Sequence, residues 1–437
     1  MKKRVLYSAL LVALALNLFV GANLYIANAK SASGDDVYSQ IELFSRVLER
    51  VRKDYVDGDK LTYQDLVYSA LKGMLGNLDP HSEFMEPEKF EDLKADTEGA
   101  FGGVGITIGI KDSYLTVVAP MEDTPAFRAG IMSGDRIIKI EGKPAGKVTL
   151  TDAVKKLRGA PGTEVNLTMF RPSSNTTRDV SLKRELIKVS TVKDLRGKSE
   201  FTLLDNKIGY ARITQFNEPT GSELEDALKK METQGVKALV IDLRGNPGGL
   251  LDQAVRVCEK FLPRNQLVVS TEGRTAGSKT EYRATGRDQH PNLPIALIVN
   301  GGSASASEIV AGCLQDLKRA ILVGEQTFGK GSVQSILPLQ AGNGPALRLT
   351  TAKYYTPSHK VIHEKGITPD IIVPISADEE EALFLQRTPG GLENLDEEKR
   401  KRVEATRDVQ LDRATDLLKG IIMFAEKPKL PGKVASR

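Results

Sequence analysis

Three serines in one short turn are the most chemically suggestive residues of this sequence. Ser303, Ser305 and Ser307 follow an apolar run at 294–299, and apolar residues recur at helical spacing after them. The pattern predicts a strand-to-helix turn, where a serine hydroxyl can be held in a cleft as a nucleophile. Serine is also favoured at helix N-termini, where it caps the helix and needs no catalytic explanation. Taken alone, the turn favours capping over catalysis.

A nucleophilic serine needs a base, and the sequence offers few candidates. Histidine is the usual base, but the chain has only 4 histidines and no Gly-x-Ser-x-Gly elbow. The alternative is a lysine kept neutral by burial, since desolvation disfavours the ammonium. Lys330 fits this role because it lies between Gly329 and Gly331, after the apolar run 320–323. An ordinary loop lysine is the competing interpretation.

The elements that would position these residues form an alternating pattern. From residue 207 to 323, strand-like and helix-like stretches alternate, which predicts an α/β layer with right-handed crossovers. Three glycine-bearing turns follow its strands, at 242–249, 300–307 and 324–331. Because the carboxyl ends of parallel strands meet at one edge of a sheet, we expect these turns to lie together.

Residues 99–171 have a different character, with short strands and one helix at about 151–157. Gly102-Gly103-Val104-Gly105-Ile106 resembles the carboxylate-binding loop of a PDZ domain, and 129–137 resembles its internal Ala-Gly-Leu-x-x-Gly-Asp signature. Successive backbone N–H groups can bind an anionic C-terminus, and a strand edge can pair with the peptide. We therefore expect substrate C-termini to bind at Gly103, Val104, Gly105 and Ile106. A small β-rich module with glycine turns is the competing interpretation.

The order of these motifs resembles that of the carboxyl-terminal processing proteases, also called tail-specific proteases. The resemblance covers roughly residues 41–375 and rests on the PDZ-like module and on the motifs at 242–249, 302–308, 324–334, 354–358 and 366–370. It implies a serine endopeptidase with a Ser–Lys dyad, and the family's spacing of 25 residues selects Ser305 with Lys330. It also implies a multidomain α/β plus β fold, with a crotonase/ClpP-like α/β protease core, a PDZ domain and helical segments at both ends. Neither a cofactor nor a metal is expected.

The resemblance assigns further roles by motif position. Gln334 matches a family glutamine whose amide would orient the lysine amine. The oxyanion hole would use the backbone N–H of Ala306 with that of Gly248 or Gly249, and the sequence does not decide between the glycines. Arg158 follows the expected groove helix and is our hypothesis for a regulatory contact between the PDZ domain and the protease core. Where the family usually has Gly-Arg after 354–358, this chain has His359-Lys360, a departure on the substrate side.

The N-terminus predicts export. Lys2-Lys3-Arg4, an apolar stretch at 5–26 and Ala27-Asn28-Ala29 indicate a signal peptide or an uncleaved anchor in the inner membrane. The bulk of the chain would then lie in the periplasm or cell envelope. The predicted domains are the signal peptide or anchor (1–29), an N-terminal helical segment (30–97), the PDZ domain (98–172), the protease core (173–375, entered through a polar linker) and a C-terminal helical segment (376–437).

Composition limits the partners. A net charge of +4, from 61 basic and 57 acidic residues, argues against nucleic acid. Protein substrates bound by their C-termini are the expected partners. The charge-rich C-terminal segment with its single apolar stripe is either a solvated tail or a surface for an adaptor or for homo-oligomers formed through the terminal helices.

Two other functions compete with proteolysis by the dyad. Ser-x-x-Lys also occurs in penicillin-recognising enzymes, but the copies at 69–72 and 190–193 have no Ser-Asp-Asn or Lys-Thr-Gly companion. The second alternative is a non-catalytic exported PDZ scaffold in which Ser305 only caps a helix.

Overall fold

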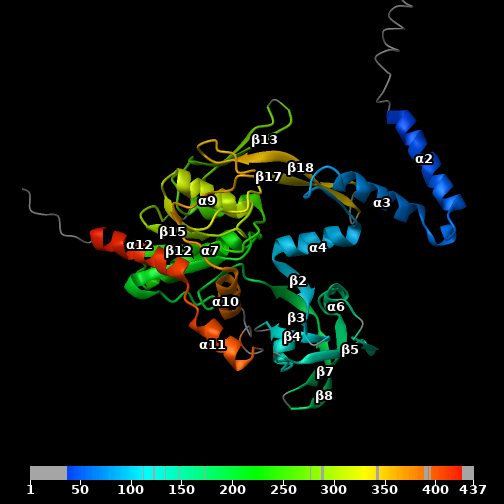
Figure 1. Ribbon diagram of the computed structural model, residues 1–437, viewed down its shortest axis with the longest axis horizontal. Coiled ribbons are helices and arrows are strands. Elements are labelled where there is room, and N and C mark those ends of the chain that lie inside the picture. Colours follow the sequence, from blue (N-terminus) through cyan, green and yellow to red (C-terminus); the bar gives the residue numbers. More distant parts are fainter. Residues whose placement is uncertain are drawn as a thin grey trace, which may run out of the picture. The chain divides into compact units, whose positions relative to one another are not determined.

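The computed structural model describes residues 37–425, except 112, 122–123, 133, 147, 173, 276, 287–289, 341–343, 388–391 and 393–394. The predicted signal peptide or anchor therefore lies outside the described residues. The chain divides into two compact units, Met1–Phe84 and Met85–Arg437 (Figure 1). Within the described part of the chain, every helix is too short or too polar to span a bilayer.

The described part of the first unit is helical. It contains α2 (Val37–Asp54), the short 3₁₀ helix η1 (Gly58–Lys60) and α3 (Tyr63–Gly76). A capping box begins α3, because Thr62 Oγ1 accepts the N–H of Asp65 at 3.0 Å and the Asp65 carboxylate accepts the N–H of Thr62 at 3.1 Å. The strand β1 (Glu83–Met85) leads into the second unit.

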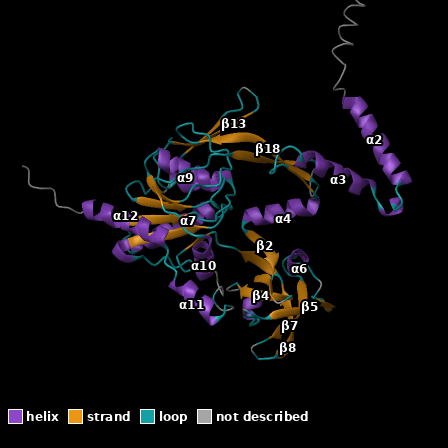
Figure 2. Cartoon of the chain, viewed as in Figure 1, coloured by secondary structure: helices purple, strands orange, loops and turns teal. Residues whose placement is uncertain are grey.

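The second unit begins with α4 (Pro87–Glu98) and a β domain. The domain has one antiparallel sheet in the order β3 (Ile106–Lys111), β4 (Tyr114–Pro120), β5 (Arg136–Ile140), β7 (Glu164–Arg171) and β8 (Thr176–Lys183). The short strand β6 (Lys143–Pro144) pairs with β5, and β2 (Ala100–Gly103) pairs with β9 (Glu185–Lys188). The helices α5 (Pro125–Arg128) and α6 (Leu150–Leu157) complete the domain (Figure 2).

This sheet continues beyond the boundary expected at residue 172. The eight residues of β7 pair antiparallel with those of β8 from Glu164–Lys183 to Arg171–Thr176. The expected polar linker is therefore wrong at its last two residues, because Thr176 and Thr177 belong to β8 and pair with Arg171 and Phe170. Its Pro and Asn residues are typical of tight turns as well as of linkers, so composition alone could not distinguish the two.

The larger domain contains the predicted parallel sheet. Its order is β10 (Val192–Lys193), β11 (Ile208–Ile213), β12 (Ala238–Asp242), β15 (Ile295–Val299), β16 (Ala320–Gly324) and β19 (Ile371–Ile372), all parallel except β10. The 3₁₀ helix η2 (Asp205–Lys207) precedes β11. Every residue of β12 and β15 is buried, as expected of strands covered on both faces.

Helices cover both faces of this sheet. On one face lie α7 (Thr220–Thr233), α8 (Leu251–Glu259) and α9 (Ala306–Asp316), whose apolar residues share a core with Leu239, Ile241 and Leu297. On the other face lies α12 (Val409–Ala425), whose Leu418 shares a core with Val240 and Ile298. Figure 1 shows α12 running alongside β12 and β15.

The place of α12 corrects one sequence-based reading. A solvated C-terminal tail is wrong for this helix, because Ala414 and Leu418 are fully buried against the sheet. Two shorter helices, α10 (Ala377–Arg387) and α11 (Glu397–Ala405), precede it. Beyond the parallel sheet, β18 (Ala346–Tyr355) pairs antiparallel with β17 (Ser332–Pro338) and with β13 (Leu267–Gly273), and β13 pairs with β14 (Thr280–Arg283).

Candidate active site

The three glycine-bearing turns meet as predicted, because they leave the carboxyl ends of neighbouring strands. The turn at 242–249 follows β12, the serine turn follows β15 and the lysine loop follows β16. Direct contacts join them. The N–H of Ala304 donates to the carbonyl of Asn246 at 3.0 Å, and the N–H of Phe328 donates to that of Ser303 at 3.1 Å.

Ser305 occupies the N-cap position of α9 in a strained conformation. Its φ of +55° and ψ of −112° are unusual for a residue with a side chain. Such strain costs on the order of 1–3 kcal/mol and is concentrated at functional sites. The residue is only 7% exposed. The capping position and a catalytic role are therefore compatible, since one turn can cap α9 and hold the hydroxyl in a fixed place.

Glu308 joins the serine turn to the lysine loop. This residue is fully buried, and its Oε2 accepts the N–H of Ser305 at 2.9 Å and that of Lys330 at 2.8 Å. Its Oε1 accepts the N–H of Gly329 at 2.7 Å and the hydroxyl of Thr327 at 2.6 Å. One carboxylate oxygen thus brings together two residues that lie 25 positions apart in the chain.

Burial raises the pKa of the Glu308 carboxyl, while its hydrogen bonds from Thr327, Gly329, Ser305 and Lys330 oppose the rise. All four donors point at the carboxylate, and each favours its ionised form. Sequence reasoning missed this role, because Glu308 is recognisable only as the residue three positions after Ser305, where a glutamate commonly completes a capping box.

The two flanking serines hold the turn. Ser303 Oγ donates to the carbonyl of Leu243 at 2.8 Å, and Ser307 Oγ donates to that of Asn246 at 2.9 Å. Both side chains are completely buried. Their hydroxyls are thus engaged with backbone carbonyls of the neighbouring turn.

Gly248 packs directly against the serine turn. A Cβ at this position would lie 2.8 Å from the Cβ of Ser305 and 2.9 Å from the nitrogen of Ala306, and the φ of +100° also favours glycine. The N–H of Gly248 donates to Asn246 Oδ1 at 2.9 Å. For the N–H of Gly249, no acceptor is present among the described residues. Because the Gly248 N–H is already engaged, Gly249 is the glycine whose N–H could donate to an oxyanion, and its place in an oxyanion hole with Ala306 stays a prediction.

Tyr354, in β18, is a second residue that sequence reasoning left without a role. It is 5% exposed, and its N–H donates to the carbonyl of Gly331, next to Lys330, at 2.8 Å. Burial raises the pKa of its hydroxyl to about 12, and a side-chain hydrogen bond with Ser305 opposes this rise. Tyr354 therefore stays protonated at neutral pH beside the candidate nucleophile.

Gln334 lies in β17, where its Nε2 donates to Ser332 Oγ at 2.9 Å and to Thr350 Oγ1 at 3.3 Å. These contacts fix the side chain close to the lysine loop. Its expected role in orienting the Lys330 amine stays a prediction.

Comparison with known proteins identifies the family. Residues 207–373 match the model of peptidase family S41, and residues 116–169 match a PDZ domain. The carboxy-terminal-processing protease of Bartonella bacilliformis is 41% identical over 435 residues, which cover 95% of this chain and 97% of that protein. The chain belongs to the carboxyl-terminal processing proteases. It is a serine peptidase with a PDZ domain, and the predicted fold class is confirmed.

Other relatives extend the comparison. The carboxy-terminal processing protease CtpA of Bacillus subtilis is 37% identical over 82% of this chain and 74% of its own length. Among solved structures, the photosystem II D1 C-terminal processing protease is 28% identical, with 80% of this chain and 97% of that chain covered and a TM-score of 0.43.

In the PDZ domain of this protease, the expected peptide-binding loop lies between β2 and β3. Gly103, Val104 and Gly105 are buried, and Gly105 has a φ of +75° that favours glycine. Ile106 begins β3, whose pairing within the described chain is with β4 alone. The other edge of β3 is thus unpaired among the described strands, and the expected role of the loop in binding a substrate C-terminus stays a prediction.

Arg158 contacts two residues that lie before the PDZ sheet in the chain. Its guanidinium pairs with Asp96 of α4 at 3.2 Å and stacks over the Phe101 ring of β2 at 4.6 Å. A hollow of about 820 Å³ between α4 and α6 is lined in part by this arginine. The expected regulatory contact with the protease core stays a prediction.

Proposed function

We propose that this protease is exported and cleaves envelope polypeptides, with Ser305 as nucleophile and Lys330 as general base. Its PDZ domain would select substrates by their free C-termini. The observation that carries the dyad is the shared contact of Glu308, whose Oε2 accepts the N–H groups of both Ser305 and Lys330. The three turns at the carboxyl ends of the parallel strands would then face the scissile peptide bond.

The chemistry follows from this arrangement. Ser305 Oγ attacks the scissile carbonyl carbon while the neutral Lys330 amine takes the hydroxyl proton. Backbone N–H groups of Ala306 and Gly249 bind the oxyanion of the tetrahedral intermediate. The lysine returns its proton to the departing amine, and water then hydrolyses the acyl-enzyme by the same steps. The protonated Tyr354 hydroxyl forms a hydrogen bond with Ser305, so the nucleophile has a hydrogen-bonding partner in addition to the Lys330 amine.

The test uses the purified full chain and an unfolded polypeptide with an apolar C-terminus. We expect endoproteolysis that slows at least about tenfold when the C-terminus is amidated, since the PDZ loop would lose its carboxylate ligand. The rate should rise with pH, because only the neutral amine acts as a base. Absence of cleavage would favour the non-catalytic PDZ scaffold, and equal cleavage of both substrates would remove the C-terminus from recognition.

Export is supported by the basic and apolar N-terminal stretch alone. Cell fractionation with N-terminal sequencing of the mature protein tests it. A mature protein whose first residue lies near position 30 would indicate a cleaved signal peptide. A protein that begins at Met1 and is found in the membrane fraction would indicate an anchor, whereas recovery from the cytoplasm would contradict export.

A further inference from the structure

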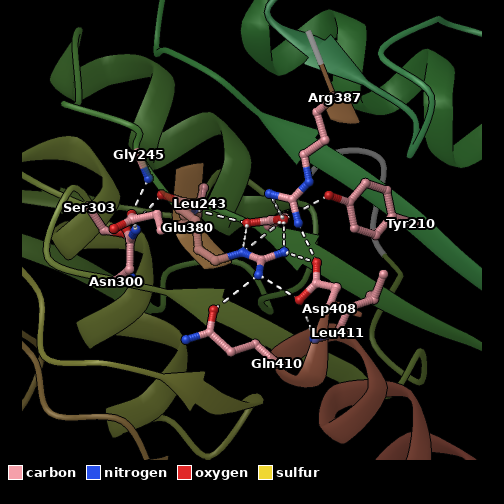
Figure 3. Close-up of polar contacts among 12 residues, drawn as sticks. Tyr210, Leu243, Gly245, Asn300, Ser303, Glu380, Arg387, Asp408, Gln410 and Leu411 are labelled. Carbon is pink, nitrogen blue, oxygen red and sulfur yellow. Dashed lines mark hydrogen bonds and ion pairs between the residues drawn. The ribbon is translucent and has the colours of Figure 1, made fainter. Parts of the chain in front are cut away.

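The C-terminal helices reach the active-site turns through buried polar contacts (Figure 3). Arg244, in the turn after β12, is 4% exposed and donates to Asp408, which immediately precedes α12. The two N–H···O distances to Asp408 Oδ1 and Oδ2 are both 2.8 Å, a bidentate geometry. Arg244 also donates to Gln410 Oε1 at 3.0 Å. The N-terminal end of α12 is thus fixed to this turn.

The contact between Arg244 and Asp408 is part of a charge-balanced cluster. Arg244 donates to Asp242 Oδ2 at 2.6 Å, Tyr210 donates to the same oxygen at 2.7 Å, and Arg387 of α10 pairs with Asp408. Burial alone would raise the pKa of the Asp408 carboxyl, but Arg244 and Arg387 hold it below its usual value. Both aspartates of the cluster are therefore ionised at neutral pH, while Tyr210 keeps its proton.

A second contact, from α10, reaches the serine turn. Asn300, the first residue after β15, is 3% exposed, and its Nδ2 donates to Glu380 Oε1 at 2.6 Å. The Asn300 Oδ1 accepts the N–H of Gly245 at 2.9 Å and that of Gly302 at 3.1 Å. A single amide side chain held by Glu380 therefore binds both turns, and Figure 3 shows it between Gly245 and Glu380.

A short series of hydrogen bonds connects these contacts to the reacting groups. Asn246 follows Arg244 by two residues, and its carbonyl accepts the N–H of Ala304, the residue before Ser305. Its side chain accepts the N–H of Gly248 at 2.9 Å. A shift of the turn after β12 would thus move both the nucleophile and the oxyanion-hole glycines.

Apolar packing already holds α12 to the sheet. Leu411, Ala414, Leu418 and Ile422 lie in one core with strand residues of the sheet. Apolar packing tolerates small displacements better than bidentate hydrogen bonds, which fix distance and direction. The polar contacts are therefore suited to setting the position of the turns.

We infer that Glu380 and Asp408 are positioning residues for proteolysis, which act through Asn300 and Arg244 to hold the two active-site turns in register. This inference rests on the proposed Ser305–Lys330 function. The C-terminal helical segment would then be needed for full catalytic activity, whatever partner its outer surface binds.

The experiment compares two variants of the full chain with two matched controls. Glu380→Ala and Asp408→Asn should each lower kcat about tenfold and leave KM within about twofold, because a displacement of about 1 Å costs on the order of a hundredfold in rate and these shifts would be smaller. Glu381→Ala and Asp412→Asn remove exposed carboxylates that pair with Lys399 and Arg407, and they should keep the wild-type kcat. Glu380→Gln keeps an acceptor oxygen for Asn300 and should restore most of the activity.

Each outcome has a distinct meaning. Wild-type kcat in both Glu380→Ala and Asp408→Asn, or a loss confined to KM, would overturn the positioning role. If Asp408→Asn fails to fold, Glu380→Ala and its rescue by Glu380→Gln decide the question. Ser305→Ala belongs in the same series, because an active Ser305→Ala would refute the dyad itself rather than the positioning residues.

Discussion

Ser305→Ala should reduce peptide cleavage to background, a loss of about 10⁴-fold or more. Alanine keeps the N–H that donates to Glu308 and removes only the hydroxyl, so the loss would report the missing nucleophile. Lys330→Ala should do the same, since its N–H also remains bound to Glu308. Initial rates on a fluorogenic peptide, with circular dichroism to verify folding, measure both effects.

The neighbouring serines provide the controls. Ser307→Ala removes one buried hydrogen bond to a backbone carbonyl, and Ser303→Ala removes such a bond together with the bond that its hydroxyl accepts from the Asn300 N–H. Each lost bond should destabilise the protein by about 1 kcal/mol, with most of the activity kept. Loss of cleavage in Ser307→Ala together with full activity in Ser305→Ala would reassign the nucleophile.

The parallel sheet was predictable because its strands are buried on both faces. Fully buried strands appear as continuous apolar runs, such as Ile295–Val299, and the glycine turns mark their carboxyl ends. Adjacent placement of three such ends follows from the topology of open α/β sheets. The convergence of the serine turn with the lysine loop could therefore be argued from the sequence, whereas the full strand order could not.

The contacts that set the geometry of the site were not predictable. Glu308 binds N–H groups contributed by another turn, and backbone donors leave no mark in the sequence. Arg244 and Asp408 are 164 residues apart, and nothing local pairs them. The apolar stripe of α12 identified a helix with one buried face but could not identify the sheet that covers it.

The antiparallel sheet that carries Tyr354 escaped prediction for a related reason. Its longest strand, Ala346–Tyr355, has only two buried residues, and arginine, threonine and lysine interrupt its apolar positions, so the sequence shows no continuous apolar run there. The position of Tyr354 beside Ser305 depends on pairing between β17 and β18, which brings Lys353 opposite Ser332. Only the register of that pair places the tyrosine near the nucleophile.

Glu308→Gln should lower kcat about a thousandfold, with little change in the affinity of the PDZ domain for a C-terminal peptide. An amide offers one acceptor oxygen where the carboxylate offers two, and its NH₂ group would face N–H donors. Because Oε1 and Oε2 receive four bonds, the serine turn and the lysine loop would separate. Displacement of one reacting group by about 1 Å costs on the order of a hundredfold, and here two groups move.

The control for this change is Glu364→Gln, since that side chain is 85% exposed beside the same loop and should keep the wild-type kcat.

Acidification offers a second test of the Glu308 carboxylate, because its protonated form also loses an acceptor. Burial raises the pKa of this carboxyl, so below the raised pKa the activity should fall more steeply than protonation of the Lys330 amine alone requires, and this extra fall should be absent from Glu308→Gln. Wild-type kcat in Glu308→Gln would show that the carboxylate is dispensable. Loss of both cleavage and peptide binding would instead indicate general unfolding, because the PDZ loop makes no contact with Glu308 among the described residues.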